Sequence, residues 1–239
     1  MYLWKCWRDT RSAFRGFVAG LLAVGIFCLY VQFDPLGWIA AKPESSRLLW
    51  HMMSDALGAQ LGKLILIAGF ILGALGVGVE FERGTADFLL TRPRSRRAFL
   101  WTSWCVGAAQ ILTLVLLAHA ITWLTAPDLP AARPGLFFRV LLGMCTMALF
   151  TYSLTYLMTT LARNSRNGTG LSLAALTAHV GLYAWLRFWH GITTPVLLDL
   201  IESRDRVDAG VRFGSLLGWL AVGLMLMVVA QLHFERAEV

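Results

Sequence analysis

The chain has 239 residues, of which 57% are hydrophobic and only 15% are charged. Soluble domains carry about 25% charged residues, so this chain has too few polar side chains to cover a surface that faces water. The composition excludes a soluble globular domain, a disordered chain and a disulfide-rich secreted scaffold, and it indicates an integral membrane protein.

The net charge is +7, from 21 Lys and Arg against 14 Asp and Glu. The basic residues lie in short segments between apolar runs, so we attribute them to the positive-inside bias and to anionic lipid headgroups and expect no nucleic-acid partner. The chain has four cysteines, and no two of them form a Cys-x-x-Cys pair. Their spacing predicts neither a disulfide framework nor a metal site.

Six charge-free apolar runs follow one another along the chain: residues 16–33, 64–79, 98–126, 140–162, 167–186 and 213–234. A helix needs about 20 residues to cross a bilayer, and the second run reaches this length if it continues backwards past Lys63, whose ammonium can reach the interface. The runs are continuously apolar rather than alternating, which excludes a barrel. We therefore predict an all-α protein with six transmembrane helices in a single domain, residues 1–239.

The distribution of Lys and Arg sets the expected orientation. With both termini in the cytoplasm, the outer loops are residues 34–63, 127–139 and 187–212, and the inner segments hold Lys and Arg at about twice the density of these loops. The first run is longer than the apolar part of a cleaved signal peptide, so we expect it to stay in the protein.

The leader, residues 1–15, is predicted to form an interfacial helix. At 100° per residue its aromatic and apolar side chains share one stripe, and its cations form a neighbouring one. The first stripe holds Leu3, Trp4, Trp7 and Phe14, and the second holds Lys5, Arg8, Arg11 and Arg15. The alternative is a plain cytoplasmic extension of the first span.

Catalytic motifs are missing: the sequence has neither Gly-x-Ser-x-Gly nor His-Glu-x-x-His. Residues 58–64 resemble a phosphate loop but lack its glycine spacing and its Ser or Thr, so we expect no nucleotide site, cofactor, metal or enzymatic activity in this chain. His119 and His179 lie within predicted spans and either contact a substrate or hydrogen-bond between helices. Two Gly-x-x-x-Gly pairs would allow close helix packing: Gly16 with Gly20, and Gly69 with Gly73.

The segment between the second and third spans, residues 80–97, is the most informative. Thr85 can cap a short helix, which Pro93 would end, and Ser95 can cap the third span. Phe88, Leu89 and Leu90 give the short helix an apolar patch. The pattern predicts a compact cytoplasmic element suited to receiving force from a soluble partner.

At these residues the sequence resembles the permease subunits of ABC-2 type ATP-binding cassette transporters. The shared pattern is acidic-x-Glu-x-Gly-Thr, then Leu-Leu, then Pro-x-Ser-Arg, and the six-span layout, size and amphipathic leader are also similar. The family often has a Lys near position 103, where this chain has Ser103. The matching positions are Glu80, Glu82, Gly84, Thr85, Leu89, Leu90, Pro93, Ser95 and Arg96.

The resemblance implies a half-transporter in a prokaryotic inner membrane that pairs with a second permease, either another copy or a paralogue, and acts as an exporter. Two separate ATPase subunits would bind ATP and Mg and dock on the loop between spans two and three, which holds the coupling helix, while the leader would act as an elbow helix. The residues implied in coupling are Glu80, Glu82, Arg83, Gly84, Thr85, Phe88, Leu89, Leu90, Pro93, Ser95 and Arg96, and those of the elbow are Trp4, Trp7, Arg8, Arg11, Phe14 and Arg15.

Three other interpretations remain open. The loop could be a solvated connector that only satisfies helix ends. An intramembrane enzyme of the CAAX-protease kind would need paired glutamates and histidines on neighbouring spans, whereas Glu80 and Glu82 fall in a loop. A membrane scaffold or an immunity-type protein that transports nothing is the third.

Overall fold

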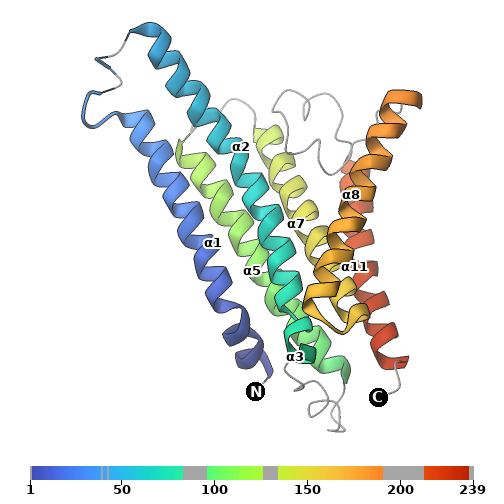
Figure 1. Cartoon of the computed structure of the whole chain (residues 1–239). Coiled ribbons are helices and arrows are strands. Elements are labelled where there is room, and N and C mark those ends of the chain that lie inside the picture. The colour runs from blue at the N-terminus through green and yellow to red at the C-terminus, as the bar shows by residue number, and fades with distance from the viewer. Residues whose placement is uncertain are drawn as a thin grey trace.

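The computed structural model of the chain describes residues 2–38, 40–41, 43–82, 96–125, 134–190 and 213–236. These residues form seven helices and no strand (Figure 1). The helices are α1 (Tyr2–Phe33), α2 (Glu44–Leu75), α3 (Gly78–Glu82), α5 (Arg96–Thr125), α7 (Pro134–Ala162), α8 (Ser165–His190) and α11 (Phe213–Arg236).

Five stretches of the described chain are long and apolar enough to cross a membrane: Leu3–Val31, Leu61–Glu82, Arg97–Thr125, Phe138–Ala162 and Leu216–Phe234. Together with the all-helical fold, they confirm a multi-pass membrane protein. The remaining predicted span, residues 167–186, is helical within α8 but is not among the five.

Several helix ends fall where the sequence predicts them. Helix α1 ends at Phe33, α7 ends at Ala162 and α11 begins at Phe213. The predicted extension of the second span past Lys63 is confirmed, because one helix runs through this residue. Charged and turn residues that border the apolar runs are strong stop signals, which explains the agreement.

Most of the segment 34–63, which the sequence analysis treats as a loop, is helical. Helix α2 begins at Glu44, so it continues for about 30 Å beyond the second apolar run. Residues 44–63 include four Leu, two Ala and two Met, which favour helix, and Pro43 stands directly before the first turn. Hydropathy marks the span but not the helix that extends from it.

The leader is not a separate element. Helix α1 runs without a break from Tyr2 to Phe33, so residues 2–15 continue the first span within one helix of 32 residues. The structure therefore places the leader against the bundle, where α1 packs on α5 and α2.

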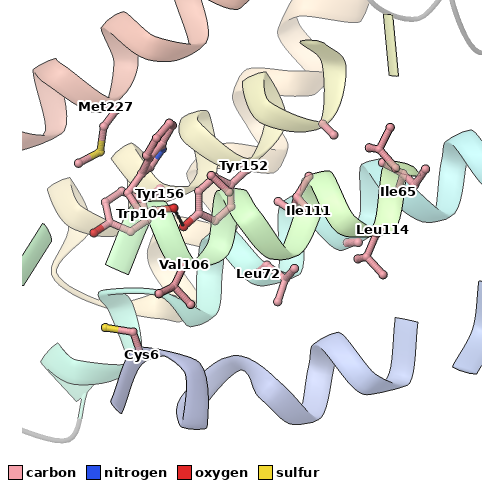
Figure 2. Packing of buried hydrophobic residues seen from close by; sticks show 14 of the residues in the cluster. Cys6, Ile65, Leu72, Trp104, Val106, Ile111, Leu114, Tyr152, Tyr156 and Met227 are labelled. Atoms are coloured by element: carbon pink, nitrogen blue, oxygen red, sulfur yellow. Dashed lines mark hydrogen bonds between the residues drawn. The ribbon is translucent and has the colours of Figure 1, made fainter. Parts of the chain in front are cut away.

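Helix α7 lies at the centre of the bundle and contacts α2, α5, α8 and α11 (Figure 1). Figure 2 shows Leu72 of α2, Ile111 of α5 and Tyr152 of α7 in the buried cluster, which Cys6 joins from α1. Helix α8 runs antiparallel to α7, since Gly168 lies against Thr159 and His179 against Phe150.

The two Gly-x-x-x-Gly pairs have different surroundings. A Cβ on Gly73 would lie 2.8 Å from both the Cβ of Thr155 and the carbonyl oxygen of Tyr152, and a Cβ on Gly69 would lie 3.0 Å from a carbonyl oxygen of α7. A Cβ on Gly16 or Gly20 would meet nothing within 4 Å. Gly69 and Gly73 therefore allow the close approach of α2 to α7. Gly16 and Gly20 lie on a face of α1 that no other described helix covers.

Candidate coupling site

The candidate site lies where a two-residue non-helical stretch separates α2 from α3. Helix α2 ends at Leu75, and α3 follows after Gly76 and Val77, with the amide of Glu80 donating to the carbonyl of Val77 at 3.0 Å. A Cβ on Gly78 would lie 3.0 Å from the Cα of Ser165. Glycine thus lets α3 pack directly against the start of α8.

Glu80 connects α3 with the leader. Its side chain is buried, and the Oε2 atom lies 2.5 Å from the Nζ atom of Lys5 in α1. A buried carboxylate requires a compensating charge or hydrogen bonds, and Lys5 supplies the charge. The ion pair therefore ties the first turn of α1 to the end of the second span.

The next two residues hold two other helices. The ring of Phe81 meets that of Phe234 of α11 edge to face, with 5.9 Å between centroids. The Oε1 atom of Glu82 accepts hydrogen bonds from the amides of Ser165 at 2.9 Å and Arg166 at 3.3 Å. Because these amides are in the first turn of α8, the carboxylate caps that helix. Its negative charge also interacts favourably with the positive end of the helix dipole.

Residues 80–82 therefore each contact a different helix: α1, α11 and α8. Residues two apart on a helix point about 200° away from each other, which explains how Glu80 and Glu82 reach opposite neighbours. The Glu-x-Glu spacing thus has a structural role in the bundle. A displacement of α3 would act on three helices at once.

Most of the predicted coupling residues lie outside the described residues, namely Arg83, Gly84, Thr85, Phe88, Leu89, Leu90, Pro93 and Ser95. Arg96 is the first residue of α5, directly after the predicted cap Ser95. Glu80 and Glu82 both lie on α3, which ends directly before Arg83 in the sequence.

The predicted elbow residues all lie on α1. The Trp7 and Phe14 rings are in contact, with 5.5 Å between centroids, which agrees with one aromatic stripe. The guanidinium of Arg8 lies 5.0 Å from the centroid of the Trp4 ring, and its Nε atom lies 3.7 Å from the Oδ1 atom of Asp9. Arg11 and Arg15 are exposed.

The sequence does not identify Lys5, Phe81 or Ser165 as partners at this site. Lys5 and Glu80 are 75 positions apart, so no local pattern joins them. A basic residue in the leader and an acidic residue at the end of the second span form a complementary pair, and this was the one signal that could have suggested the contact.

The polar residues of α7 mostly support helix packing. The hydroxyl of Tyr156 donates to the carbonyl of Leu100 at 3.1 Å, and that of Tyr152 donates to the carbonyl of Trp104 at 3.2 Å. Gln110 of α5 donates to the hydroxyl of Thr10 at 2.9 Å. These contacts join α5 to α7 and to α1.

The two candidate histidines lie in different surroundings. His119 is buried in α5. His179 of α8 lies between the rings of Phe150 and Trp219, with centroids 6.2 Å and 5.2 Å away. In the part of the chain that the structure describes, no three His, Cys, Asp or Glu side chains are placed to hold a metal ion.

Comparison of the sequence with known protein families gives no match, and comparison with curated proteins gives none either.

Proposed function

We propose that this chain is the permease subunit of an ABC-2 type exporter, driven by ATP that separate subunits hydrolyse. Three findings support the proposal: the motif that begins at Glu80, the multi-pass helical bundle, and the contacts of α3. The observation that carries it is that residues 80–82 hold three helices where the proposed coupling loop begins.

In this proposal the ATPase pushes on residues 83–95, and α3 passes the displacement into the bundle. Phe88, Leu89 and Leu90 form the apolar anchor, at about 1.5–3 kcal/mol for each fully buried side chain. Glu80 and Glu82 lie on the permease side of this contact, where they transmit movement to α1 and α8. Packed helices transmit such shifts because close-packed interiors resist compression.

The proposal includes six spans, with α8 as the fifth. Helix α8 has 26 residues, about 39 Å of helix, which is enough to cross a bilayer. It starts beside α3 and runs antiparallel to α7, while α11 returns Phe234 to α3. The start of α1, α3 and the end of α11 thus share one end of the bundle (Figure 1), which we assign to the cytoplasm.

The test is to purify the tagged full chain in mild detergent and measure its native mass and ATP hydrolysis. We expect a complex of two permeases with two ATP-binding subunits that hydrolyses ATP. Hydrolysis should disappear when a residue of the partner's phosphate loop is changed. A lone monomer that performs its cellular role in the absence of any ATPase would contradict the proposal.

A further inference from the structure

A groove runs between the leader and α5, inward from near the end of the bundle that carries α3. It has a volume of about 510 Å³, and its lining is mostly apolar. Leu3 and Trp7 line it from α1, and α5 lines it between Trp101 and Thr113. A groove of this size falls within the range of small-molecule sites, about 300–1,000 Å³.

A polar group is buried at the groove. Gln110 lines it with only 2% of its surface exposed, and its Nε2 atom donates to Thr10. Among the described residues, no group donates to its Oε1 atom. A buried amide oxygen without a donor is costly, so a ligand with a hydroxyl or another donor would be favoured here.

Cations follow the groove along α1. Arg11 comes one turn after Trp7, about 40° away around the helix, and Arg8 and Arg15 continue the same exposed side. Within the described part of the chain, neither Arg11 nor Arg15 forms an ion pair. Arg8 is partly compensated by the carboxylate of Asp9, 3.7 Å away, so this stripe of three arginines keeps a net positive charge beside the groove.

The depth of these cations makes compensation necessary. Thr10 is level with Gln110, about 20 Å along α5 from Arg97, and α5 carries no Lys, Arg, Asp or Glu beyond Arg97. Arg8 and Arg11 thus lie beside an apolar stretch of α5, from which a long cationic side chain can extend towards the headgroups at the α3 end of the bundle. Charge at this depth is costly unless it meets an anion or reaches the headgroups.

We propose that the groove binds an anionic phospholipid, with one acyl chain between the leader and α5 and the phosphate drawn to Arg8 and Arg11. A second copy of this chain fits less well. In a symmetric contact, each stripe would face the stripe of the partner, and each chain carries a net charge of +7. A phosphate neutralises the stripe, and a lipid hydroxyl can donate to Gln110. The proposal requires only insertion in a membrane and is independent of the transport function.

The test is native mass spectrometry of the delipidated full chain in detergent, titrated with phosphatidylglycerol or with phosphatidylcholine of the same acyl chains. We expect phosphatidylglycerol to be retained about 25-fold more tightly, at about fivefold for each of two arginines, because the choline cation of phosphatidylcholine offsets its phosphate charge. Arg11→Gln should weaken its binding about fivefold. The matched control is Arg139→Gln, an exposed Arg in α7 at the other end of the bundle, which should leave binding unchanged.

A second pair of variants tests the groove itself. Ala109 lines it, so Ala109→Phe should fill it and abolish tight binding, whereas Ala120→Phe, at an exposed position of α5 that does not line it, should have no effect. The proposal would be overturned if Arg11→Gln and Arg139→Gln weakened phosphatidylglycerol binding equally, or if the Ala109→Phe variant bound this lipid as tightly as wild type. A dimer that excludes lipid and that Ala109→Phe dissociates would also overturn it, because the occupant would then be a second copy.

Discussion

The Lys5–Glu80 ion pair gives the sharpest prediction about stability. The two side chains are 25% and 5% exposed, and their charged atoms are 2.5 Å apart. Removing one partner of a fully buried pair costs about 3–5 kcal/mol, whereas an exposed pair contributes no more than about 1 kcal/mol. Because the ammonium of Lys5 can still reach water, we expect Glu80→Gln to cost about 2 kcal/mol, between these two limits.

Lys5→Met should cost more, about 3 kcal/mol, because it leaves the carboxylate of Glu80 buried without this cation. The double variant Lys5→Met/Glu80→Gln should be more stable than the sum of the single losses predicts, by about 1–2 kcal/mol. Lys63→Met, at an exposed lysine of α2, is the matched control and should be neutral.

The assay is the fraction of full-length protein that stays monodisperse in detergent after heating. A loss of about 2 kcal/mol corresponds to a midpoint lowered by about 4–8 °C for a chain of this size. Losses that add within about 0.5 kcal/mol in the double variant would show that the two charges do not interact. The claim that the Lys5–Glu80 ion pair joins the leader to α3 would then be contradicted.

Three further predictions concern packing, capping and topology. Gly73→Leu should abolish monodisperse protein, because its Cβ would lie 2.8 Å from atoms of α7. Gly20→Leu should be tolerated, because its Cβ meets nothing within 4 Å, and size-exclusion chromatography compares the two variants. Glu82→Ala removes the acceptor for two amides of α8 and should lower the same thermal midpoint by about 2–4 °C, with no change meaning that water caps α8 equally well. A reporter that is active only outside the cytoplasm should be silent when fused after Arg94 and active when fused within residues 190–210. The reverse pattern would invert the proposed orientation.

The sequence predicts the parts of the fold that local chemistry decides. Apolar runs bounded by charged or turn residues locate the ends of α1 at Phe33 and of α7 at Ala162. Hydropathy missed the extension of α2 to Glu44, because helix propensity continues where apolarity stops. Helix ends are thus predictable where both signals change together.

The contacts of the candidate site depend on which helix faces meet, and a linear pattern does not contain that information. Gly69 with Gly73 and Gly16 with Gly20 have the same spacing, yet only the first pair packs against another helix. Lys5 and Glu80 meet because α1 and the end of α2 lie side by side, although they are far apart in the sequence. The acidic pair of the motif was predictable, but its partners were not.

Recruitment of an ATPase by the loop tests the central claim most directly. Leu89→Asp removes one apolar anchor and places a charge where it must be desolvated, so it should abolish co-purification of the ATPase and transport without preventing membrane insertion. Leu129→Asp, the same change in the segment between α5 and α7, is the matched control and should retain both co-purification and transport. If Leu89→Asp protein is properly inserted and both activities stay near wild type, residues 80–97 are only a connector and the coupling function is contradicted.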